Sequence, residues 1–309
     1  MLPWWNRLRA AATRLRRRIR KETDDEAMVS WESYYDWRRE DYHTVVGDVR
    51  IMERVWSPQL KNRRNLLVYL PPGYARETDR RYPVIYMHDG QNLFDQATAF
   101  DQEWRVDETM ERLSRDGLEA IIVGIPNAGV QRLAEYSPFD DNYHGKGRGH
   151  LYLSFVVDTV KPMIDSDFRT LPGREHTGTI GSSMGGLVSL YAFFSHGDIF
   201  SFAGVMSPSL WFAGSAIFRY VRHAPYVDGR LYLDAGTREL GGSPADKEAR
   251  ARSRRYYASV RRLQRLLVKK GYRPHHNLLV VEEKWAGHNE PAWAGRLPGA
   301  LRFLLAEGG

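Results

Sequence analysis

The stretch HTGTIGSSMGGLVSLYAFF, residues 176–194, joins a short β-branched run to an apolar helical pattern through a turn rich in glycine and serine. The run at 177–180 is typical of a strand, and apolar residues spaced by three and four positions predict a helix over 187–194. The turn matches Gly-x-Ser-x-Gly with Ser183 at its centre, the pattern of a nucleophile elbow, in which a strained strand-to-helix turn exposes the serine hydroxyl. The sequence therefore predicts a strand, a sharp turn and a helix, with Ser183 as a nucleophile.

Strand and helix patterns alternate through the chain on both sides of this stretch. Further strand patterns occur at 84–87, 120–125, 203–206, 231–234 and 277–281. Helical patterns occur at 104–115, 151–164 and 244–270. Residues 45–56 and 65–70 are predicted to pair as two antiparallel strands. We expect an α/β fold with a mostly parallel central sheet, helices on both faces and an antiparallel amino-terminal strand pair.

The composition limits the chemistry that the chain can perform. A chain of 309 residues with 42% hydrophobic content is long enough to bury a substantial core, and α/β folds often use this length for one domain. Because the sequence has no cysteine, disulfides, thiolate metal sites and a cysteine nucleophile are excluded. A net charge of +7 does not demand a polyanionic partner, so we expect no nucleic acid. No apolar run reaches the length of about 18 residues that indicates a membrane span.

Residues 1–26 differ in composition from the rest of the chain. Apolar residues recur there at three- and four-residue steps among many arginines, which predicts a basic amphipathic helix. It does not read as a secretory signal, because no apolar core segment follows the charged part. Such a helix can lie along an anionic membrane surface through residues 1–20, bind a polyanion, dock on the rest of the protein or form an ordinary surface helix. Residues 27–309 are predicted to form one α/β domain, and we expect a cytoplasmic protein with the option of peripheral membrane association.

The strand at 84–87 is followed by His88-Asp89-Gly90-Gln91, at the edge of the sheet where open α/β folds build their sites. Acyl transfer needs two backbone N–H groups aimed at the developing oxyanion, one after the nucleophile and one from the loop after an earlier strand. Met184 supplies the first N–H, and Gln91 is predicted to supply the second because Gly90 lets the backbone turn inward. The side chains of His88 and Asp89 are expected to shape this turn.

Candidate substrate contacts lie at the same edge. Residues 131–148 are rich in Gly, Asn, Asp and Tyr, and a long irregular loop over a sheet edge is more often functional than idle. This loop carries Arg132 and Tyr136, and the segment after a later strand brings Trp211 to the same side. Together with Asp89, these residues are the predicted substrate contacts.

The base and the acid are sought after later strands, because this kind of site orders nucleophile, acid and histidine along the chain. His288 lies in the loop after the last predicted strand and is the predicted general base. Two carboxylates compete for the role of the acid. Asp234 ends the strand at 231–234, whereas Glu239 lies three residues beyond Gly236, in a loop from which it can reach across to a histidine. We favour Glu239 and keep Asp234 as the alternative.

Several short motifs, spread over residues 45–305, combine into a specific set. They are Tyr69-Leu70-Pro71-Pro72-Gly73-Tyr74, His88-Asp89-Gly90-Gln91, Glu135-Tyr136-Ser137-Pro138, Gly181-Ser182-Ser183-Met184-Gly185-Gly186-Leu187, Ser207-Pro208-Ser209-Leu210-Trp211 and Ala286-Gly287-His288. This set resembles the Putative esterase family of α/β-hydrolases, which includes enterochelin (siderophore) esterases, feruloyl and acetyl-xylan esterases, S-formylglutathione hydrolases and mycobacterial mycolyltransferases. The resemblance implies the α/β-hydrolase fold. Residues 236–242 also resemble the mycolyltransferase acid loop, in which the glutamate is the triad member, and this supports Glu239.

From these residues we predict a serine carboxylic-ester hydrolase that uses Ser183, His288 and Glu239 and forms a covalent acyl-enzyme, with no metal or organic cofactor. The expected substrates are small-molecule or carbohydrate esters of the short-chain acyl, acetyl-sugar, feruloyl-sugar or siderophore type. Two alternatives stay open. The same site could transfer the acyl group to an alcohol instead of water, or the fold could be a non-catalytic binding module delivered by its basic amino-terminal helix. The oligomeric state is left open.

Overall fold

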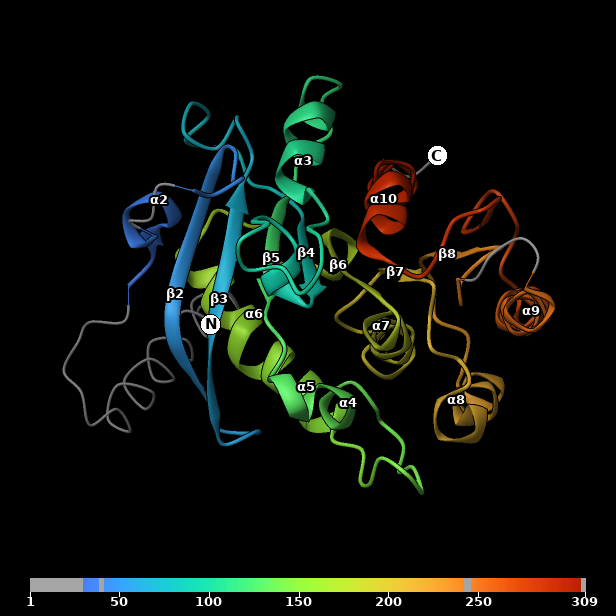
Figure 1. The fold of residues 1–309 in the computed structure, drawn as a ribbon. Coiled ribbons are helices and arrows are strands. Elements are labelled where there is room, and N and C mark those ends of the chain that lie inside the picture. Colours follow the sequence, from blue (N-terminus) through green and yellow to red (C-terminus); the bar gives the residue numbers. More distant parts are fainter. Residues whose placement is uncertain (1–29, 39–41, 242–245, 307–309) are drawn as a thin grey trace, which may run out of the picture.

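A nine-stranded sheet runs through the protein, with its strands in the order β1-β2-β3-β5-β4-β6-β7-β8-β9 (Figure 1). The computed structural model describes residues 30–38, 42–241 and 246–306. From one edge of the sheet to the other, the strands are β1 (Glu32–Ser33), β2 (Asp48–Ser57), β3 (Asn62–Leu70), β5 (Ile121–Ile125), β4 (Val84–His88), β6 (Thr177–Ser182), β7 (Phe202–Met206), β8 (Arg230–Gly236) and β9 (Leu278–Glu283).

The sheet is mostly parallel. β4 pairs with β5 on one side and with β6 on the other, and β7, β8 and β9 continue the parallel series. β2 and β3 form an antiparallel pair, and β3 joins the parallel strands by pairing antiparallel with β5. The prediction of a mostly parallel sheet with an antiparallel amino-terminal strand pair is therefore confirmed.

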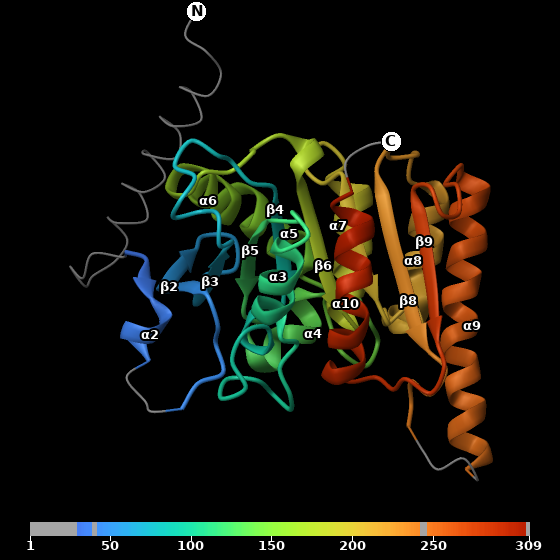
Figure 2. The ribbon, with the colours of Figure 1, turned by 90° about the horizontal axis from the view of Figure 1, so that it is seen from above.

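Helices cover both faces of this sheet, and β4 shows how the faces are divided. Val84 and Tyr86 belong to one apolar cluster, whereas Ile85 and Met87 belong to a second, because successive side chains of a strand point to opposite faces. The helices that contribute to the first cluster are α5 (Gly149–Phe155), α6 (Lys161–Asp167), α7 (Met184–Ser195), α8 (Phe212–His223) and α9 (Lys247–Lys270). Those that contribute to the second are α2 (Tyr34–Trp37), α3 (Val106–Ser114) and α10 (Glu290–Leu304), and Figures 1 and 2 show the two groups around the sheet.

Two helices in the carboxyl-terminal third of the chain, α8 and α10, were not predicted from the sequence. α8 follows β7, and α10 follows directly on the loop that carries His288. The side chain of Asn289 caps α10 by accepting a hydrogen bond of 3.1 Å from a backbone amide of the first turn, and Pro291 lies where a missing N–H costs nothing. The loop expected at 131–148 also contains a short helix, α4 (Arg132–Glu135), so it is more regular than its composition indicated.

Two predictions lie outside the described residues. They are the basic amphipathic helix at 1–26 and the membrane contact through residues 1–20. The division of the chain into this segment and one domain at 27–309 stays a prediction. Within the described part of the chain, no helix combines the length and the apolar character that crossing a bilayer requires.

The turn after β4 lies directly against the neighbouring strand β5. A Cβ atom on Gly90 would lie 2.6 Å from the carbonyl carbon of Gly124 and 2.6 Å from the amide nitrogen of Ile125. Both are backbone atoms of a paired strand, so they cannot move aside as the end of a flexible side chain would. Only glycine fits here, and the turn that holds Gln91 is fixed against the sheet.

We expect Gly90→Ala to lower the free energy of unfolding by about 1–3 kcal/mol, because the added methyl group overpacks the turn. Gly299→Ala is the matched control, since this position in α10 is exposed and an added Cβ would meet no atom within 4 Å. It should raise the free energy of unfolding by about 0.5–1 kcal/mol, the usual gain when alanine replaces glycine in a helix. Urea unfolding followed by circular dichroism measures both, and a Gly90→Ala protein as stable as the wild type would contradict the steric argument.

Candidate active site

Ser183 occupies the turn between β6 and α7. Its φ of 58° and ψ of −119° lie outside the regions that residues other than glycine ordinarily adopt. The turn is held from the neighbouring strand: the amide of Ser183 donates to the carbonyl of Met206 at 3.0 Å, and the carbonyl of Ser183 accepts from the amide of Ser209 at 2.9 Å. A Cβ on Gly181 would lie 2.7 Å from the carbonyl carbon of Gly185, so the strand and the helix can meet this closely only with glycine there.

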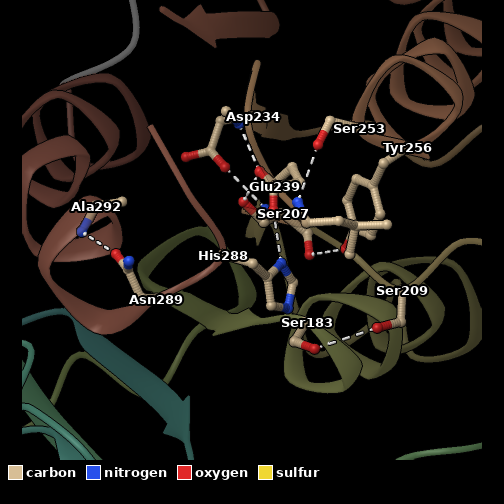
Figure 3. A network of polar contacts seen from close by, with 12 residues as sticks. Ser183, Ser207, Ser209, Asp234, Glu239, Ser253, Tyr256, His288, Asn289 and Ala292 are labelled. Carbon is tan, nitrogen blue, oxygen red and sulfur yellow. Dashed lines mark hydrogen bonds and ion pairs between the residues drawn. The ribbon is translucent and has the colours of Figure 1, made fainter. Parts of the chain in front are cut away.

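His288 and Glu239 meet at the carboxyl end of the sheet (Figure 3). Glu239 Oε2 lies 2.6 Å from His288 Nδ1, and the side chain of Glu239 is fully buried while that of His288 is 24% exposed. The parallel pairing of β8 with β9 brings the loops that follow these strands together. The rings of Tyr256 and Trp293 pack edge-on against the imidazole, with centroids 5.5 and 5.0 Å away. These contacts fix the orientation of the imidazole.

The close-up view shows the imidazole of His288 between Glu239 and Ser183 (Figure 3). Because Nδ1 contacts the carboxylate, the second ring nitrogen, Nε2, is the one left for the serine. Among the described residues, the hydroxyl of Ser183 hydrogen-bonds Ser209 Oγ at 3.2 Å and makes no hydrogen bond to His288. A proton transfer to His288 therefore requires the Ser183 hydroxyl to turn from Ser209 toward the imidazole, and hydrogen bonds of this kind often tighten only when substrate is bound.

Asp234 ends at the same edge of the sheet but contacts other groups. Its carboxylate accepts hydrogen bonds from Arg296 Nε at 2.8 Å and from the amide of Ser207 at 2.8 Å. The side chains of Asp234 and Arg296 are 0% and 3% exposed. Burial raises the pKa of Asp234, and the adjacent guanidinium of Arg296 acts in the opposite direction. The structure therefore brings Glu239, and not Asp234, to the imidazole.

The two backbone N–H groups predicted to bind an oxyanion belong to neighbouring turns. Met184 begins α7, and Gln91 lies in the single helical turn that follows β4. The two turns approach closely, since a Cβ on Gly185 would lie 3.5 Å from Asp89 Oδ2. Within the part of the chain that the structure describes, neither N–H donates to another protein group. Both are therefore available to a ligand, as the first amides of a helix commonly are.

A polar cluster holds Asp89 beside this turn. The backbone of Asp89 is left-handed, with φ of 56°, and Arg132 binds its two carboxylate oxygens at 2.7 and 2.8 Å. Asn127 Nδ2 donates to one of these oxygens at 2.7 Å, and the amide of Asp89 donates to the hydroxyl of Tyr136 at 2.9 Å. Tyr136 is fully buried and supports the turn, whereas the side chain of Arg132 is 26% exposed and Trp211 is 55% exposed. Substrate contact by these residues stays a prediction.

His88 is buried beneath the elbow. Its Nδ1 lies 2.8 Å from the hydroxyl of Tyr152, and its Nε2 lies 3.1 Å from the hydroxyl of Thr179. Burial lowers the pKa of His88 to about 4, because the charged imidazole would lose its hydration there. A neutral His88 thus links β4 to β6 at neutral pH.

Sequence reasoning gave several residues of the site no role in it, although two of them, Ser207 and Ser209, belong to one of the motifs that carry the resemblance. Ser207, Ser209, Tyr256 and Arg296 lie on three separate segments, and they reach the site only when β7, α9 and α10 pack together. The two serines could have been singled out from their place at the carboxyl end of a strand, where open α/β sheets build sites. Among the described residues, no group of three or more His, Cys, Asp or Glu side chains is arranged to hold a metal ion.

Comparison with known proteins identifies both sequence and structural relatives. The Putative esterase family matches the chain over residues 57–304. An uncharacterised protein of Bacillus subtilis, YbbA, is 25% identical over 262 residues, which cover 81% of this chain and 96% of that protein. A siderophore triacetylfusarinine C esterase of Aspergillus fumigatus is 29% identical over 136 residues, which cover 42% of this chain and 44% of that protein.

A solved structure supports the fold. The siderophore hydrolase EstA of Aspergillus nidulans is 20% identical, and the match covers 83% of this chain and 95% of that chain with a TM-score of 0.66. At this level of identity the likeness concerns the fold alone. Together with the family match, it confirms the α/β-hydrolase fold.

We expect His88 to reduce the stability of the protein in acid. Its folded-state pKa of about 4 lies below the ordinary value of 6.5, so the unfolded chain binds the proton more readily and the free energy of unfolding falls as the pH is lowered from about 6.5 to about 4. The whole loss should be about 3 kcal/mol, since each pKa unit corresponds to about 1.4 kcal/mol.

Urea unfolding of the wild type and of His88→Gln at about pH 7 and about pH 4.5 measures this effect. The variant should lose less stability than the wild type between the two pH values. His223→Gln is the matched control, because this histidine is exposed, and it should follow the wild type. The same pH dependence in His88→Gln as in the wild type would show that His88 is not the responsible group.

Proposed function

The chain belongs to the Putative esterase family and is a carboxylic ester hydrolase, and we propose that Ser183, His288 and Glu239 form its catalytic triad. The observation that carries this proposal is the hydrogen bond of 2.6 Å between Glu239 and His288 beside a serine in the strained backbone conformation of a nucleophile elbow. The order serine, acid, histidine along the chain agrees with it, because this fold usually presents its triad in that order.

The first half of the proposed reaction forms an acyl-enzyme. The hydroxyl of Ser183 attacks the ester carbonyl carbon while His288 Nε2 accepts its proton, and the carboxylate of Glu239 stabilises the imidazolium through Nδ1–H. The carbonyl oxygen becomes an oxyanion, which accepts hydrogen bonds from the backbone N–H groups of Gln91 and Met184. Collapse of this intermediate breaks the ester C–O bond, and the imidazolium returns its proton to the departing alcohol.

The second half of the reaction releases the carboxylic acid product. His288 accepts a proton from a water molecule, and the resulting hydroxide attacks the acyl carbon on Ser183. The same two N–H groups stabilise the second oxyanion. When this intermediate collapses, the proton on His288 goes to Ser183 Oγ, and the free enzyme is regenerated.

We propose small-molecule or carbohydrate esters as the substrates, of the short-chain acyl, acetyl-sugar, feruloyl-sugar or siderophore type. Similarity to a siderophore triacetylfusarinine C esterase supports testing siderophore-type esters among the first. Arg132 and Trp211 offer a partly exposed arginine side chain and an exposed indole for binding. A panel of the four ester types with purified enzyme ranks them by kcat/KM, and product analysis with an added alcohol distinguishes hydrolysis from acyl transfer.

Ser183→Ala should abolish the hydrolysis of p-nitrophenyl acetate, with a loss in kcat of at least about 10⁴-fold, because no other group replaces the nucleophile. Spectrophotometric release of p-nitrophenolate measures the rate, and the thermal midpoint checks that the variant is folded. Ser195→Ala is the matched control, because Ser195 lies at the far end of α7 and should keep wild-type activity. A fully active Ser183→Ala protein would end the proposal.

The two carboxylates should respond differently to removal of their charge. Glu239→Gln should lower kcat by about 10³-fold or more, because the imidazolium loses its ionic partner. Asp234→Asn should keep kcat within about tenfold of the wild type but lower the free energy of unfolding by about 3–5 kcal/mol, because it removes the buried counter-ion of Arg296 and leaves only Glu283, whose side chain is 44% exposed. Steady-state kinetics and urea unfolding of both variants check this, and the opposite pattern in kcat would assign the acid to Asp234.

A further inference from the structure

Behind the carboxylate of Glu239 lies a polar contact that the proposed reaction does not use. The hydroxyl of Ser207, just after β7, lies 2.6 Å from Glu239 Oε1, and Arg296 of α10 donates from Nη2 to the same hydroxyl oxygen at 3.0 Å. Ser207, Glu239 and Arg296 are 0%, 2% and 5% exposed. One buried hydroxyl thus connects an arginine to the proposed triad acid, and Figure 3 shows Ser207 beside Glu239.

The arginine decides the direction of this hydrogen-bond chain. A guanidinium has N–H donors and no acceptor, so Ser207 Oγ accepts from Arg296. A serine hydroxyl carries a single proton, and Glu239 Oε1 is the partner that receives it. The amide of Gly236 donates to the same Oε1 at 2.5 Å. With two donors on Oε1, the other carboxylate oxygen stays available to His288.

Further contacts hold Arg296 and Ser207 in place. Arg296 donates to Asp234 from Nε at 2.8 Å and from Nη2 at 3.2 Å, and from Nη1 to Glu283 at 3.0 Å. The amide of Ser207 donates to Asp234 Oδ1 at 2.8 Å, and its carbonyl accepts from the hydroxyl of Tyr256 at 2.6 Å. These bonds come from the end of β8, from the end of β9 and from α9. Together they fix the position of the Arg296 guanidinium relative to the Ser207 hydroxyl.

Arg296 also compensates one of two buried negative charges. The side chains of Asp234 and Glu239 are both fully buried. Burial raises the pKa of Asp234, the charge of Glu239 raises it further, and Arg296 opposes both effects. Two buried carboxylates without a cation tend to share a proton. Arg296 places its positive charge directly beside Asp234 in this pair.

We propose that Arg296 is a positioning residue of the active site, which acts on Glu239 through Ser207; this role rests on the proposed triad. Arg296 directs the Ser207 proton to Glu239 Oε1 and leaves Oε2 to His288. Asp234 then serves to hold Arg296 and is not a second acid. Because Arg296 contacts neither the nucleophile nor the oxyanion donors, its loss should lower kcat and leave KM nearly unchanged.

A double-mutant cycle on Ser207→Ala and Arg296→Met tests the chain. With p-nitrophenyl acetate, at a temperature where all variants are folded, each single variant should lose about 10- to 100-fold in kcat, the size expected when a carboxylate loses one charge-assisted hydrogen bond. KM should stay within about twofold. The double variant should be no slower than the slower single variant, within about twofold, because both changes break the same chain.

A second double variant distinguishes a positioning role of Arg296 from a purely structural one. Asp234→Asn combined with Arg296→Met removes both partners of the buried pair, so stability should recover relative to Arg296→Met alone. In contrast, kcat should stay about 10- to 100-fold below the wild type, because nothing directs the Ser207 proton. Arg64→Met is the matched control. It breaks another buried ion pair, with Glu135 at 2.8 Å, and should lose stability while keeping kcat within about twofold.

Three results would each overturn the positioning role. The first is a wild-type kcat in Ser207→Ala, and the second is additive losses in the double-mutant cycle. The third is a kcat that recovers together with stability in Asp234→Asn/Arg296→Met. These results remain distinct from a failure of the triad. If Ser183→Ala and Glu239→Gln are inactive while Ser207→Ala and Arg296→Met keep full kcat, only the role of Arg296 falls. If Ser183→Ala keeps its activity, the triad itself falls.

Discussion

Neighbouring parallel strands end together at one edge of the sheet, and the groups of the proposed site follow five of these strands in turn. β4 leads to Gln91, β6 to Ser183, β7 to Ser209, β8 to Glu239 and β9 to His288. The main-chain hydrogen bonds between the strands set a continuous register across the sheet, and apolar clusters on both faces exclude water from those bonds. A slip of one residue in any of these strands would turn its side chains to the opposite face and move its loop away from the others.

This register also explains how the protein tolerates a strained nucleophile. The unusual backbone of Ser183 persists because hydrogen bonds to Met206 and Ser209 of the neighbouring strand and loop determine it from outside the turn. The glycines at 90 and 181 let the backbone of adjacent segments come into direct contact. The strain at one residue is thus offset by packing and hydrogen bonds spread over three strands, while the serine hydroxyl stays at the edge.

The electrostatic arrangement of the site depends on giving each buried charge its own partner. Glu239 faces His288, and Asp234 faces Arg296, so two neighbouring carboxylates serve different groups. Burial alone would favour protonation of such carboxylates, because a charged group without a partner is costly in the interior. The arrangement is compatible with many ester chemistries, because the fold and the triad do not specify the acyl or alcohol group. We therefore expect specificity to depend on the loops at the edge, where Arg132 and Trp211 lie.

Much of the fold follows from the sequence by itself, because its signals are local. The elbow around Ser183, the buried strand runs and the antiparallel pair are each encoded within a few neighbouring residues, and chain order alone pointed to the loops of Glu239 and His288. The helix α10 went unpredicted, since its pattern is interrupted by glycine and proline. Only the tertiary structure decided which carboxylate meets the imidazole. Asp234 and Glu239 are five residues apart, and the choice depends on Arg296, 62 positions beyond Asp234, which reaches it only when α10 packs on the sheet. Side-chain pairing between distant segments leaves no local trace in the sequence, because it is set by how whole elements pack together.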